Sequence, residues 1–329
     1  MNRYRIPPLS LEGVKTYPLA KRSSKVGVAD FAVPPKPGAS VGKFIDGLPN
    51  ILAVQSLRAV AEAVVAARRK RKPIIWGLGG HVIKCGLGPV LIDLMRRGFV
   101  SCLAMNGAAM IHDFEIAWVG HTSEDVEAGL GKGQFGMAEE TSRTINVAIS
   151  AGDAQGLGAG EAVGKILNPS RRRPRFAKAS LLSTAYRQRI PVTVHLAIGT
   201  DINMNHPSVD AAALGAASHR DFRLLARMVS KMGGGGVYLN LGSAVILPEV
   251  FLKCVSLARN LGHSLQRIVT ANFDFIQHYR PTQNVVLRPT ARTGKGYALT
   301  GHHELMIPLL AATVLETDRK KRTKRSGGE

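Results

Sequence analysis

Apolar residues along the first part of the chain alternate between helical and strand-like spacing. Residues 57–70 place apolar side chains at helical spacing and end in a basic run, which suits a helix C-terminus. The following residues predict a buried strand at 73–76, a glycine turn at 77–81, a helix over 82–98 and a second buried strand at 99–105. This succession predicts a right-handed βαβ unit.

The same alternation continues through the rest of the chain. Further helices are expected over residues 138–150, 177–189, 219–232, 246–262 and 304–316, and further strands over residues 191–198, 237–241 and 267–272. We therefore expect one doubly wound, mostly parallel, Rossmann-like α/β domain over residues 51–316, with helices on both faces of the sheet. Residues 1–50, rich in Pro, Lys and Ser, predict an extended N-terminal arm, and residues 317–329 predict a basic disordered tail.

The composition supports a globular protein with a full core. Of 329 residues, 45% are hydrophobic and 5% are aromatic, so aliphatic side chains supply that core. Three cysteines without CxxC spacing argue against a disulfide framework and against a structural zinc site, and they favour a reducing, cytoplasmic compartment. The N-terminus lacks the apolar core of a signal peptide, and no apolar window is long enough to predict a membrane span.

The formal net charge is +21, and much of it comes from three basic runs. These runs lie at 68–72, 171–175 and 319–325, in predicted loops or in the tail. They have two interpretations: a nucleic-acid surface, or solvated loops with a disordered basic tail. The runs lack the interleaved aromatic residues on which a single-strand binder stacks bases, so the pattern favours solvated loops over nucleic-acid binding.

Small and polar residues follow all five predicted strands. Ligands bind at the carboxyl ends of the strands in sheets of this class, so five such exits together predict a ligand crevice. The residues at the exits are Gly77, Gly79, Gly80 and His81; Asn106, Gly107, Ala108, His112 and Asp113; Thr200, Asp201, Asn203, Asn205 and His206; Gly242 and Ser243; and Asn272 and Asp274.

The first exit resembles the dinucleotide-binding fingerprint only in part. The segment 77–82 supplies the first two glycines, but Val82 stands where the third belongs. Asn106 replaces the acidic residue that would hold a ribose at the end of the second strand. The loop suits an anion at a helix N-terminus, and it equally suits a tight strand-to-helix turn.

Ten histidines are present, and several lie near predicted turns or strand ends. No HxH or HExxH pattern brings them together with a carboxylate, so we expect no metal site. One or two of them suit a hydrogen-bonding or acid–base role, and for any single histidine a structural role is the alternative.

Residues 76–120 resemble the NAD-binding region of deoxyhypusine synthases. Gly77 matches the family's glycine, residues 79–81 replace its small polar triplet, and residues 83–86 match its Ile-x-x-Gly helix start. Residues 106–109 match the second loop, and Asp113 matches the last acidic residue. Similar segments follow in the family's order at residues 190–201, 236–262, 267–275 and 301–312, so the resemblance spans roughly residues 50–315.

This resemblance implies NAD as cofactor, a polyamine or related small amine as substrate, and a homotetramer whose N-terminal arm reaches over a neighbouring subunit. The implied cofactor-binding residues are Gly77, Gly79, Gly80, His81, Asn106, Gly107, Ala108, Asp113, Gly242, Ser243, Thr270, Ala271, His302 and His303. The candidate substrate-binding and proton-handling residues are His112, Asp201, His206 and Asp274, and the candidate nucleophile is Lys295.

The sequence departs from the family where its catalytic lysine and histidine should lie. Ungapped alignment puts Arg288 or Pro289 at the lysine and Pro248 at the histidine, and Lys295 fits only with gaps. Arginine stays protonated and cannot form a Schiff base, which argues against deoxyhypusine synthesis itself. The leading hypothesis is NAD-dependent oxidation or transfer of an amine, and the alternative is a non-catalytic assembly or regulatory protein.

Overall fold

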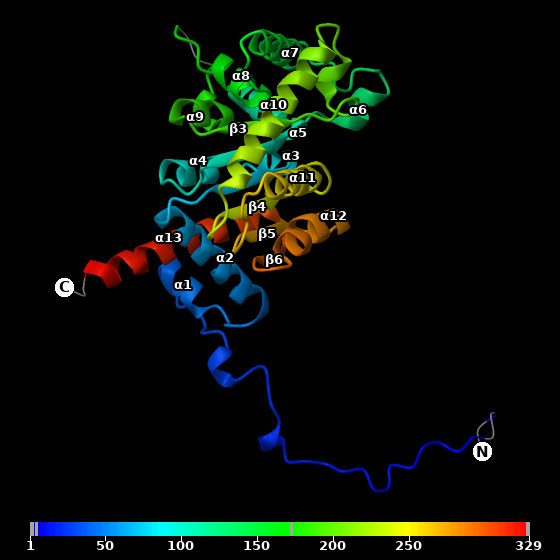
Figure 1. Cartoon of the computed structure of the whole chain (residues 1–329), viewed down its shortest axis with the longest axis vertical. Helices are drawn as coiled ribbons and strands as arrows, with labels where there is room; N and C mark the ends of the chain where they lie inside the picture. The colour runs from blue at the N-terminus through cyan, green and yellow to red at the C-terminus, as the bar shows by residue number, and fades with distance from the viewer. Residues whose placement is uncertain (1–2, 4–5, 172–173, 327–329) are drawn as a thin grey trace.

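A parallel sheet forms the centre of the computed structural model, which describes residues 3, 6–171 and 174–326. The strands are β1 Ile74–Leu78, β2 Cys102–Asn106, β3 Val192–His195, β4 Val237–Leu241, β5 Val269–Asp274 and β6 Lys295–Thr300. They lie in the order β3-β2-β1-β4-β5-β6, with every neighbouring pair parallel. The chain order therefore reverses between β1 and β4, where sheets of this kind bind ligands (Figure 1).

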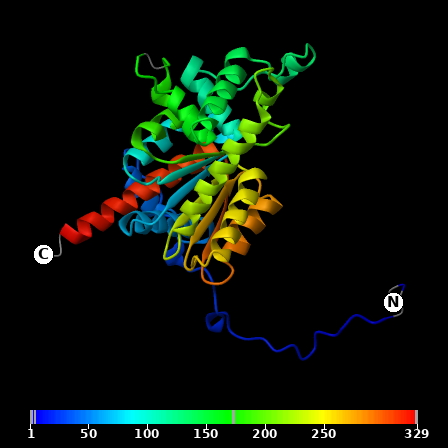
Figure 2. The same ribbon diagram turned by 45° about the horizontal axis from the view of Figure 1, so that its top comes forward.

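Helices cover both faces of the sheet, which confirms the predicted doubly wound α/β fold (Figures 1 and 2). The α-helices are α1 Val41–Gly47, α2 Leu52–Arg69, α3 Gly80–Lys84, α4 Gly88–Arg96, α5 Gly107–Val119, α6 Val126–Leu130, α7 Glu139–Asp153, α8 Ala159–Ile166, α9 Leu181–Gln188, α10 Ala211–Ser230, α11 Ile246–Asn260, α12 Tyr279–Pro281 and α13 His303–Ser326. Helices α2, α4 and α13 share the larger apolar cluster with one face of the sheet. Helices α10 and α11 pack on the other face, around Tyr238 and Phe251.

Short turns connect the longer elements. The 3-10 turns are η1 Leu19–Lys21, η2 Val28–Asp30, η3 Ala177–Ala179, η4 Ile202–Asn205 and η6 Arg288–Thr290, and η5 Thr282–Leu287 is a π-helical turn. Strands β1 and β4 are buried along their whole length, as expected for strands covered on both faces. The sheet thus presents its two ends, and not its faces, to ligands and partners.

The structure differs from the prediction at Gly86 and at the edge of the sheet. The helix expected over 82–98 is two helices, α3 and α4, because Gly86 adopts a left-handed φ of +71° between them. Strand β6 was not predicted from the pattern, since it lies at the sheet's edge and only Leu299 of its six residues is buried. Half-exposed edge strands lack the apolar run that revealed the central strands.

Two buried carboxylates tie the helices beyond β3 to the sheet. Asp221 on α10 accepts backbone hydrogen bonds from Gly160 at 2.9 Å and from Val194 at 2.8 Å, which joins α10, α8 and β3. Asp113 on α5 caps α9 by accepting from the backbone of Leu181 at 2.7 Å and of Leu182 at 2.9 Å. Figure 1 shows α6 to α9 gathered at this end of the sheet.

The two ends of the chain differ in how they relate to the domain. Residues 6–27 run away from the body as exposed, extended chain with one short turn (Figure 1). The backbones of Asp30 and Val33 then hydrogen-bond those of Asn50 and Gly47, each at 2.8 Å. The tail predicted to be disordered from residue 317 instead continues α13 to Ser326, and residues 327–329 lie outside the described residues. Asp318 explains this difference, because its buried carboxylate pairs with Arg68 and Arg69 of α2, each at 3.2 Å.

Candidate functional site

The exits of β1 and β4 approach each other closely at the switch point. The backbone N–H of Gly79 donates to the carbonyl oxygen of Leu241 at 2.9 Å. A β-carbon on Gly79 would lie 2.0 Å from the carbonyl oxygen of Gly242, so only glycine fits here. The second glycine of the partial fingerprint is therefore required by the packing of two strand exits, whatever binds above them.

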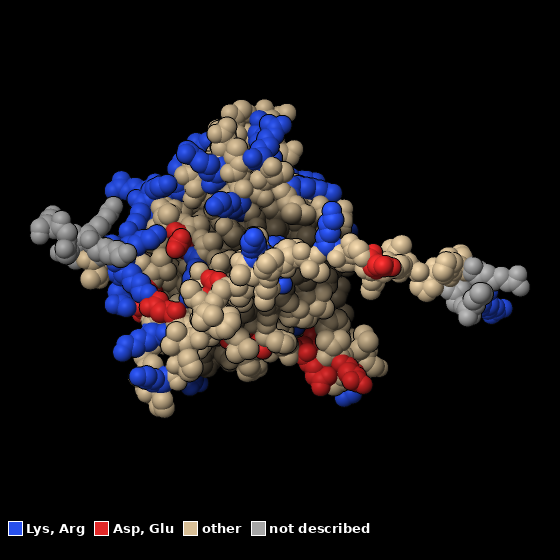
Figure 3. All heavy atoms as spheres, turned by 90° about the horizontal axis from the view of Figure 1, so that it is seen from below, with Lys and Arg blue, Asp and Glu red and all other residues tan. Residues whose placement is uncertain are grey.

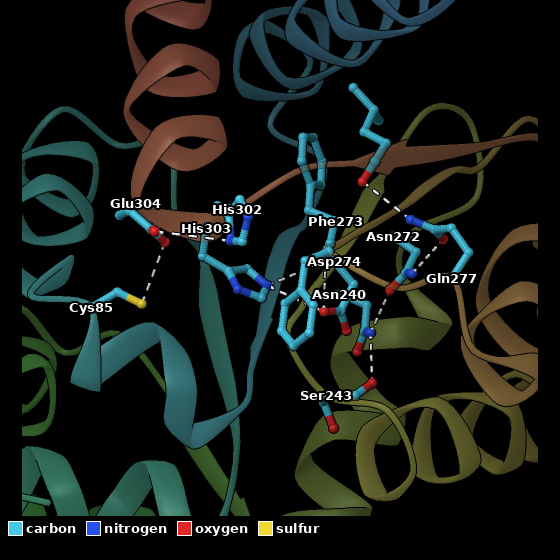
Figure 4. Close-up of polar contacts among 12 residues, drawn as sticks. Cys85, Asn240, Ser243, Asn272, Phe273, Asp274, Gln277, His302, His303 and Glu304 are labelled. Carbon is cyan, nitrogen blue, oxygen red and sulfur yellow. Dashed lines mark hydrogen bonds and ion pairs between the residues drawn. The ribbon is translucent and has the colours of Figure 1, made fainter.

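A buried histidine stands beside this junction. His303, at the start of α13, is 1% exposed, and its Nε2 lies 3.2 Å from the carbonyl oxygen of Phe273 (Figure 4). Burial lowers the pKa of His303 even though Asp274 lies nearby, so the ring is neutral. A neutral ring that donates from Nε2 to a carbonyl leaves Nδ1 as an acceptor. Among the described residues, Nδ1 of His303 has no hydrogen-bond partner although it is buried.

Aromatic and carboxylate groups surround His303. Its Nε2 lies 3.8 Å from Oδ1 of Asp274, the last residue of β5. The ring centroid of His81 lies 5.4 Å from that of His303, and the exposed ring of Phe275 lies 6.1 Å from it. Phe275 also stacks at 6.1 Å with His302, whose side chain is largely exposed. These residues come from α3, from the end of β5 and the residue after it, and from the start of α13 and the residue before it. They form one cluster at the carboxyl ends of the strands.

A chain of side-chain amides crosses β4, β5 and β6 beside the cluster (Figure 4). Gln277 donates to the carbonyl oxygen of Leu299 at 3.2 Å, Asn272 donates to Gln277 at 2.8 Å, and Asn240 donates to Asn272 at 2.7 Å. A carbonyl can only accept, so this end of the chain fixes the orientation of all three amides. The same Nδ2 of Asn240 donates to the carbonyl of Ser243, and Oδ1 of Asn240 is left buried without a partner in the described part of the molecule.

On the other side of the junction, His112 is held by a short relay. Its Nδ1 lies 2.7 Å from the hydroxyl of Thr122, which in turn hydrogen-bonds Glu115. Burial acts to raise the pKa of Glu115, but hydrogen bonds from His112, Thr122 and Thr141 outweigh it and leave the pKa lowered. A β-carbon on Gly80 would lie 3.1 Å from Cδ2 of His112, so the ring edge faces the start of α3.

Asp201 lies over the exit of β2. A β-carbon on Gly107 would lie 2.0 Å from Oδ2 of Asp201, so the carboxylate occupies the space above the first residue of α5. Oδ2 accepts from the backbone N–H of Ala197 at 2.8 Å, and burial raises the pKa of Asp201. Asn106 uses its side-chain oxygen to cap α5 through the N–H of Ala109 at 2.9 Å. That oxygen is therefore already engaged by the helix.

The structure thus brings most of the predicted exit residues together. The residues gathered around the switch point are Gly79, Gly80, His81, Asn106, Gly107, Ala108, His112, Asp201, Gly242, Asp274, His302 and His303. Ser243 lies at the same edge, where its hydroxyl accepts from the N–H of Leu247 at 3.2 Å in the first turn of α11.

Other predicted site residues lie elsewhere. Lys295 is the first residue of β6, so it stands at the amino-terminal edge of the sheet, opposite the exits. Thr270 and Ala271 are buried inside β5, where the hydroxyl of Thr270 donates to the carbonyl of Val285 at 2.6 Å. Gly77 lies within β1, and a β-carbon there would meet the hydroxyl of Tyr238 at 2.6 Å. Thr270, Ala271 and Gly77 therefore contribute to the packing of the sheet.

Two predicted site residues, Asp113 and His206, make their contacts in the helical region beyond β3. Both carboxylate oxygens of Asp113 accept hydrogen bonds from residues at the start of α9, and burial raises the pKa of Asp113 to about 6. His206 contacts Ser208 and Glu139, each at 2.8 Å, beside α7. Neither residue therefore joins the cluster at the switch point.

Several residues of the cluster were missed by sequence reasoning. Glu115 and Phe275 lie within segments of the family resemblance but at positions that no motif singled out, Thr122 lies just beyond such a segment, and Cys85 donates to Glu304 at 3.7 Å. The described cavities of about 430–550 Å³ are lined by other segments.

Within the described residues, no three His, Cys, Asp or Glu side chains are placed to hold a metal ion. No helix there is long and apolar enough to cross a membrane.

Comparison with known proteins gives structural relatives without a sequence family. No family model and no curated protein matches the sequence. A LOR/SDH protein from Methanococcus maripaludis S2 superposes with a TM-score of 0.51 at 15% identity, covering 87% of this chain and 74% of that one. This likeness shows a shared fold.

Two other structures match with lower TM-scores. The ternary complex of AgrE with ornithine and NAD+ matches with a TM-score of 0.49 at 18% identity, covering 81% of this chain. The present chain spans about a third of AgrE, namely 33% of its length. A protein described as a deoxyhypusine synthase from Entamoeba histolytica matches with a TM-score of 0.47 at 12% identity, covering 84% of this chain and 93% of that one.

Proposed function

We propose that the carboxyl ends of β1 and β4 bind a nicotinamide dinucleotide and that the site oxidises a small amine. The observation that carries this proposal is the cluster of His303, Asp274, His81 and His112 at the point where the strand order reverses. The ordered resemblance of residues 50–315 to deoxyhypusine synthases supports the same cofactor.

The residues present fit the sugar and carboxamide groups of such a cofactor. Nδ1 of His303 and Oδ1 of Asn240 are buried acceptors without a partner in the described residues, and hydroxyl or amide N–H groups would satisfy them. The residues that would hold the cofactor are His81, His303, Asn240 and the backbone at Gly80 and Gly242. When bound, the nicotinamide ring supplies the hydride acceptor.

Local acidic groups support an amine as the substrate. In a chain with a net charge of +21, Asp201, Asp274 and Glu304 nevertheless lie around the strand exits. Carboxylates attract an ammonium group, and the exposed ring of Phe275 gives its alkyl chain an apolar contact. The same carboxylates would repel an anionic substrate, so the site suits a polyamine or another cationic amine.

His112 is the residue placed to take the proton. The Thr122–Glu115 relay engages Nδ1, and no partner for Nε2 is present among the described residues. With the cofactor bound, the nicotinamide ring would accept a hydride from the carbon next to nitrogen, and Nε2 of His112 would take the N–H proton, which would leave a C=N bond in the substrate. Water then hydrolyses that bond to an aldehyde and a free amine.

Transfer of the substrate's carbon chain to Lys295 is not part of this proposal. Strand β6 runs six residues from Lys295 to Thr300, so the lysine lies about 16 Å from the exits at the rise of a β-strand. The activity that we propose therefore ends with oxidation and hydrolysis of the amine.

A second copy of the chain would cover the strand exits, in keeping with the homotetramer that the resemblance implies. Apolar side chains in the segments that follow β4 and β5 are exposed in the single chain: Val245, Phe275, Ile276 and Tyr279. A group of several exposed apolar residues on one part of the surface favours a contact with another protein chain. Light scattering coupled to gel filtration tests this, and a monomer at micromolar concentration would contradict it.

The second candidate is a non-catalytic protein that binds the nucleotide for assembly or regulation. The absence of a lysine from the gathered exit residues favours this candidate. Both candidates bind the dinucleotide, so the discriminating measurement is turnover.

The test follows absorbance at 340 nm with NAD+ and a panel of cationic amines, including spermidine and ornithine, beside neutral and anionic analogues. NADH formation with a cationic amine, lost in His112→Ala, supports the enzyme. Binding of NAD+ without turnover of any amine supports the non-catalytic candidate. Calorimetry that detects no NAD+ binding at millimolar cofactor contradicts both.

A further inference from the structure

The opposite end of the sheet carries an unusual distribution of charge. Each strand is preceded by a short segment, and because the strands are parallel these segments lie along one edge, which we call the amino edge. The segments are 70–73, 97–101, 189–191, 231–236, 261–268 and 291–294. Each contains at least one Lys or Arg, and none contains Asp or Glu.

Most of these cations are not neutralised within the chain. Arg97 pairs with Asp93 at 2.7 Å, but the remaining amino-edge cations have no ion pair with any residue that the structure describes. They are Lys70, Arg71, Lys72, Arg189, Lys231, Arg267 and Arg292. All except Lys72 are exposed. Figure 3 shows Lys and Arg side chains gathered on the left of the molecule, toward the C-terminal end of α13.

Two cavities open along this edge, and no acidic residue lines either. One, of about 500 Å³, is lined by Lys70, Arg71, Lys72 and Lys231 among others. The other, of about 470 Å³, is lined by basic and uncharged residues that include Arg292.

A glycine-rich loop connects the two cavities. In residues 233–236 the N–H of Gly234 donates to the carbonyl of Gln266, which lines the second cavity, at 2.8 Å. A β-carbon on Gly234 would lie 3.3 Å from Cε of Lys72, which lines the first. The floor between the cavities is therefore bare backbone, over which a ligand's own backbone can approach closely.

Helix ends account for only part of this charge. Helices α2, α4, α9, α10 and α11 end at this edge, and a cation in the last turn is favoured there. Arg68 and Arg69 already fill that role in α2, and three further cations follow them. Arg267 lies seven residues beyond the end of α11, outside the reach of its last turn.

We propose that the amino edge binds the phosphate backbone of a nucleic acid. The six strands place the cations along about 24 Å at the usual spacing between strands, which is the length of several nucleotides. The amino-edge segments contain one exposed large apolar residue, Leu261, which is too little to anchor the edge in a membrane. Phe99, the aromatic residue of these segments, is buried, so recognition rests on phosphates and not on stacked bases.

The test is fluorescence anisotropy of the full chain with labelled single-stranded RNA, duplex RNA and duplex DNA between 50 and 300 mM KCl. The edge variant combines Arg71→Glu, Lys231→Glu and Arg267→Glu. The matched control combines Lys132→Glu, Lys178→Glu and Arg223→Glu, which reverses three exposed cations away from the edge. Melting temperatures show whether each variant is folded, and a milder set with glutamine replaces either triple that is not.

We expect the wild-type affinity to fall steeply with salt, and the edge variant to bind at least tenfold more weakly at 150 mM KCl with a salt slope reduced by about 3. The control should change affinity less than threefold. A preference for one of the three nucleic acids identifies the type of nucleic acid that the amino edge binds, and it supports the proposal. Equal losses in both variants, no binding by the wild type, or stronger edge-dependent binding to phosphatidylserine vesicles than to any nucleic acid would overturn it.

Discussion

Nε2 of His303 lies 3.8 Å from Oδ1 of Asp274, so the first residue of α13 and the last residue of β5 meet beside the exits of β1 and β4. Both side chains are at least 95% buried, and the neutral ring keeps a free acceptor at Nδ1. This pair joins an acceptor for the proposed cofactor to a carboxylate for the proposed amine, and it is the first place to test the site.

Replacing Asp274 with asparagine removes the negative charge and keeps the shape of the side chain. We expect kcat/KM for a cationic amine to fall at least tenfold, mainly through KM, while the Kd for NAD+ changes less than threefold. Steady-state kinetics and calorimetry measure the two quantities. An equal loss of cofactor binding would show that Asp274 supports the fold of the site instead.

Replacing His303 with alanine removes the buried acceptor for the cofactor. We expect the Kd for NAD+ to rise about tenfold, which corresponds to about 1.4 kcal/mol. His302→Ala is the matched control, because that neighbouring side chain is largely exposed and should change the Kd little. If both variants bind NAD+ as the wild type does, the cofactor does not use Nδ1 of His303.

Glu115 acts through Thr122 and is therefore a positioning residue for His112. In Glu115→Gln we expect kcat to fall about tenfold and the acidic limb of the pH profile of kcat/KM to move to lower pH, because the relay loses its negative charge. Thr122→Ser should retain activity, since its hydroxyl can make both hydrogen bonds. A loss of activity with an unchanged pH profile would indicate a purely structural role.

The buried carboxyl group of Asp221 should make the free energy of unfolding depend on pH. Burial raises its pKa from 3.8 to about 7, so the folded protein holds this proton more tightly than the unfolded chain does. The stabilisation from this group is complete below about pH 4 and is lost as the pH rises through about 7. Asp221→Asn cannot titrate, so its destabilisation relative to the wild type should be larger at pH 5 than at pH 8. Melting curves at both pH values measure this, and a constant difference would contradict it.

Ion pairs of Asp318 hold α13 against α2. Its buried carboxylate pairs with Arg68 and Arg69, each at 3.2 Å, and with Arg322 at 2.8 Å. Asp318→Ala should lower the free energy of unfolding by about 1–3 kcal/mol, less than for a fully buried pair because the arginines are partly exposed. Arg322→Ala, at a 65% exposed side chain, should cost less than about 1 kcal/mol. Urea denaturation compares the two, and equal losses would contradict this account.

The central sheet was predictable because fully buried parallel strands appear as short apolar runs. Strand β4, expected over 237–241, has those bounds in the structure. Strand β6 gave no such signal because it lies at the edge, with residues that are mostly half-buried or exposed. The break at Gly86 was missed because an apolar helical pattern continues on both sides of it.

The candidate site was predictable at the level of strand exits but not of individual contacts. Knowing where strands end places Gly79 and Asp274 at one edge, since parallel strands share a direction. Which polar residues turn inward depends on tertiary partners, so Asp113 could not be recognised in advance as a cap of α9. The orphaned oxygen of Asn240 likewise follows from an amide chain across three strands, whose side-chain partners no single segment reveals.

The central claim is that ligands bind where β1 and β4 end. A crystal structure of the protein soaked with NAD+ and spermidine tests it most directly. We predict nicotinamide dinucleotide density that crosses the exits of β1 and β4, with a sugar or carboxamide group within hydrogen-bond distance of Nδ1 of His303. Dinucleotide density elsewhere, with the side chains at those exits unchanged and packed against one another, would contradict the account.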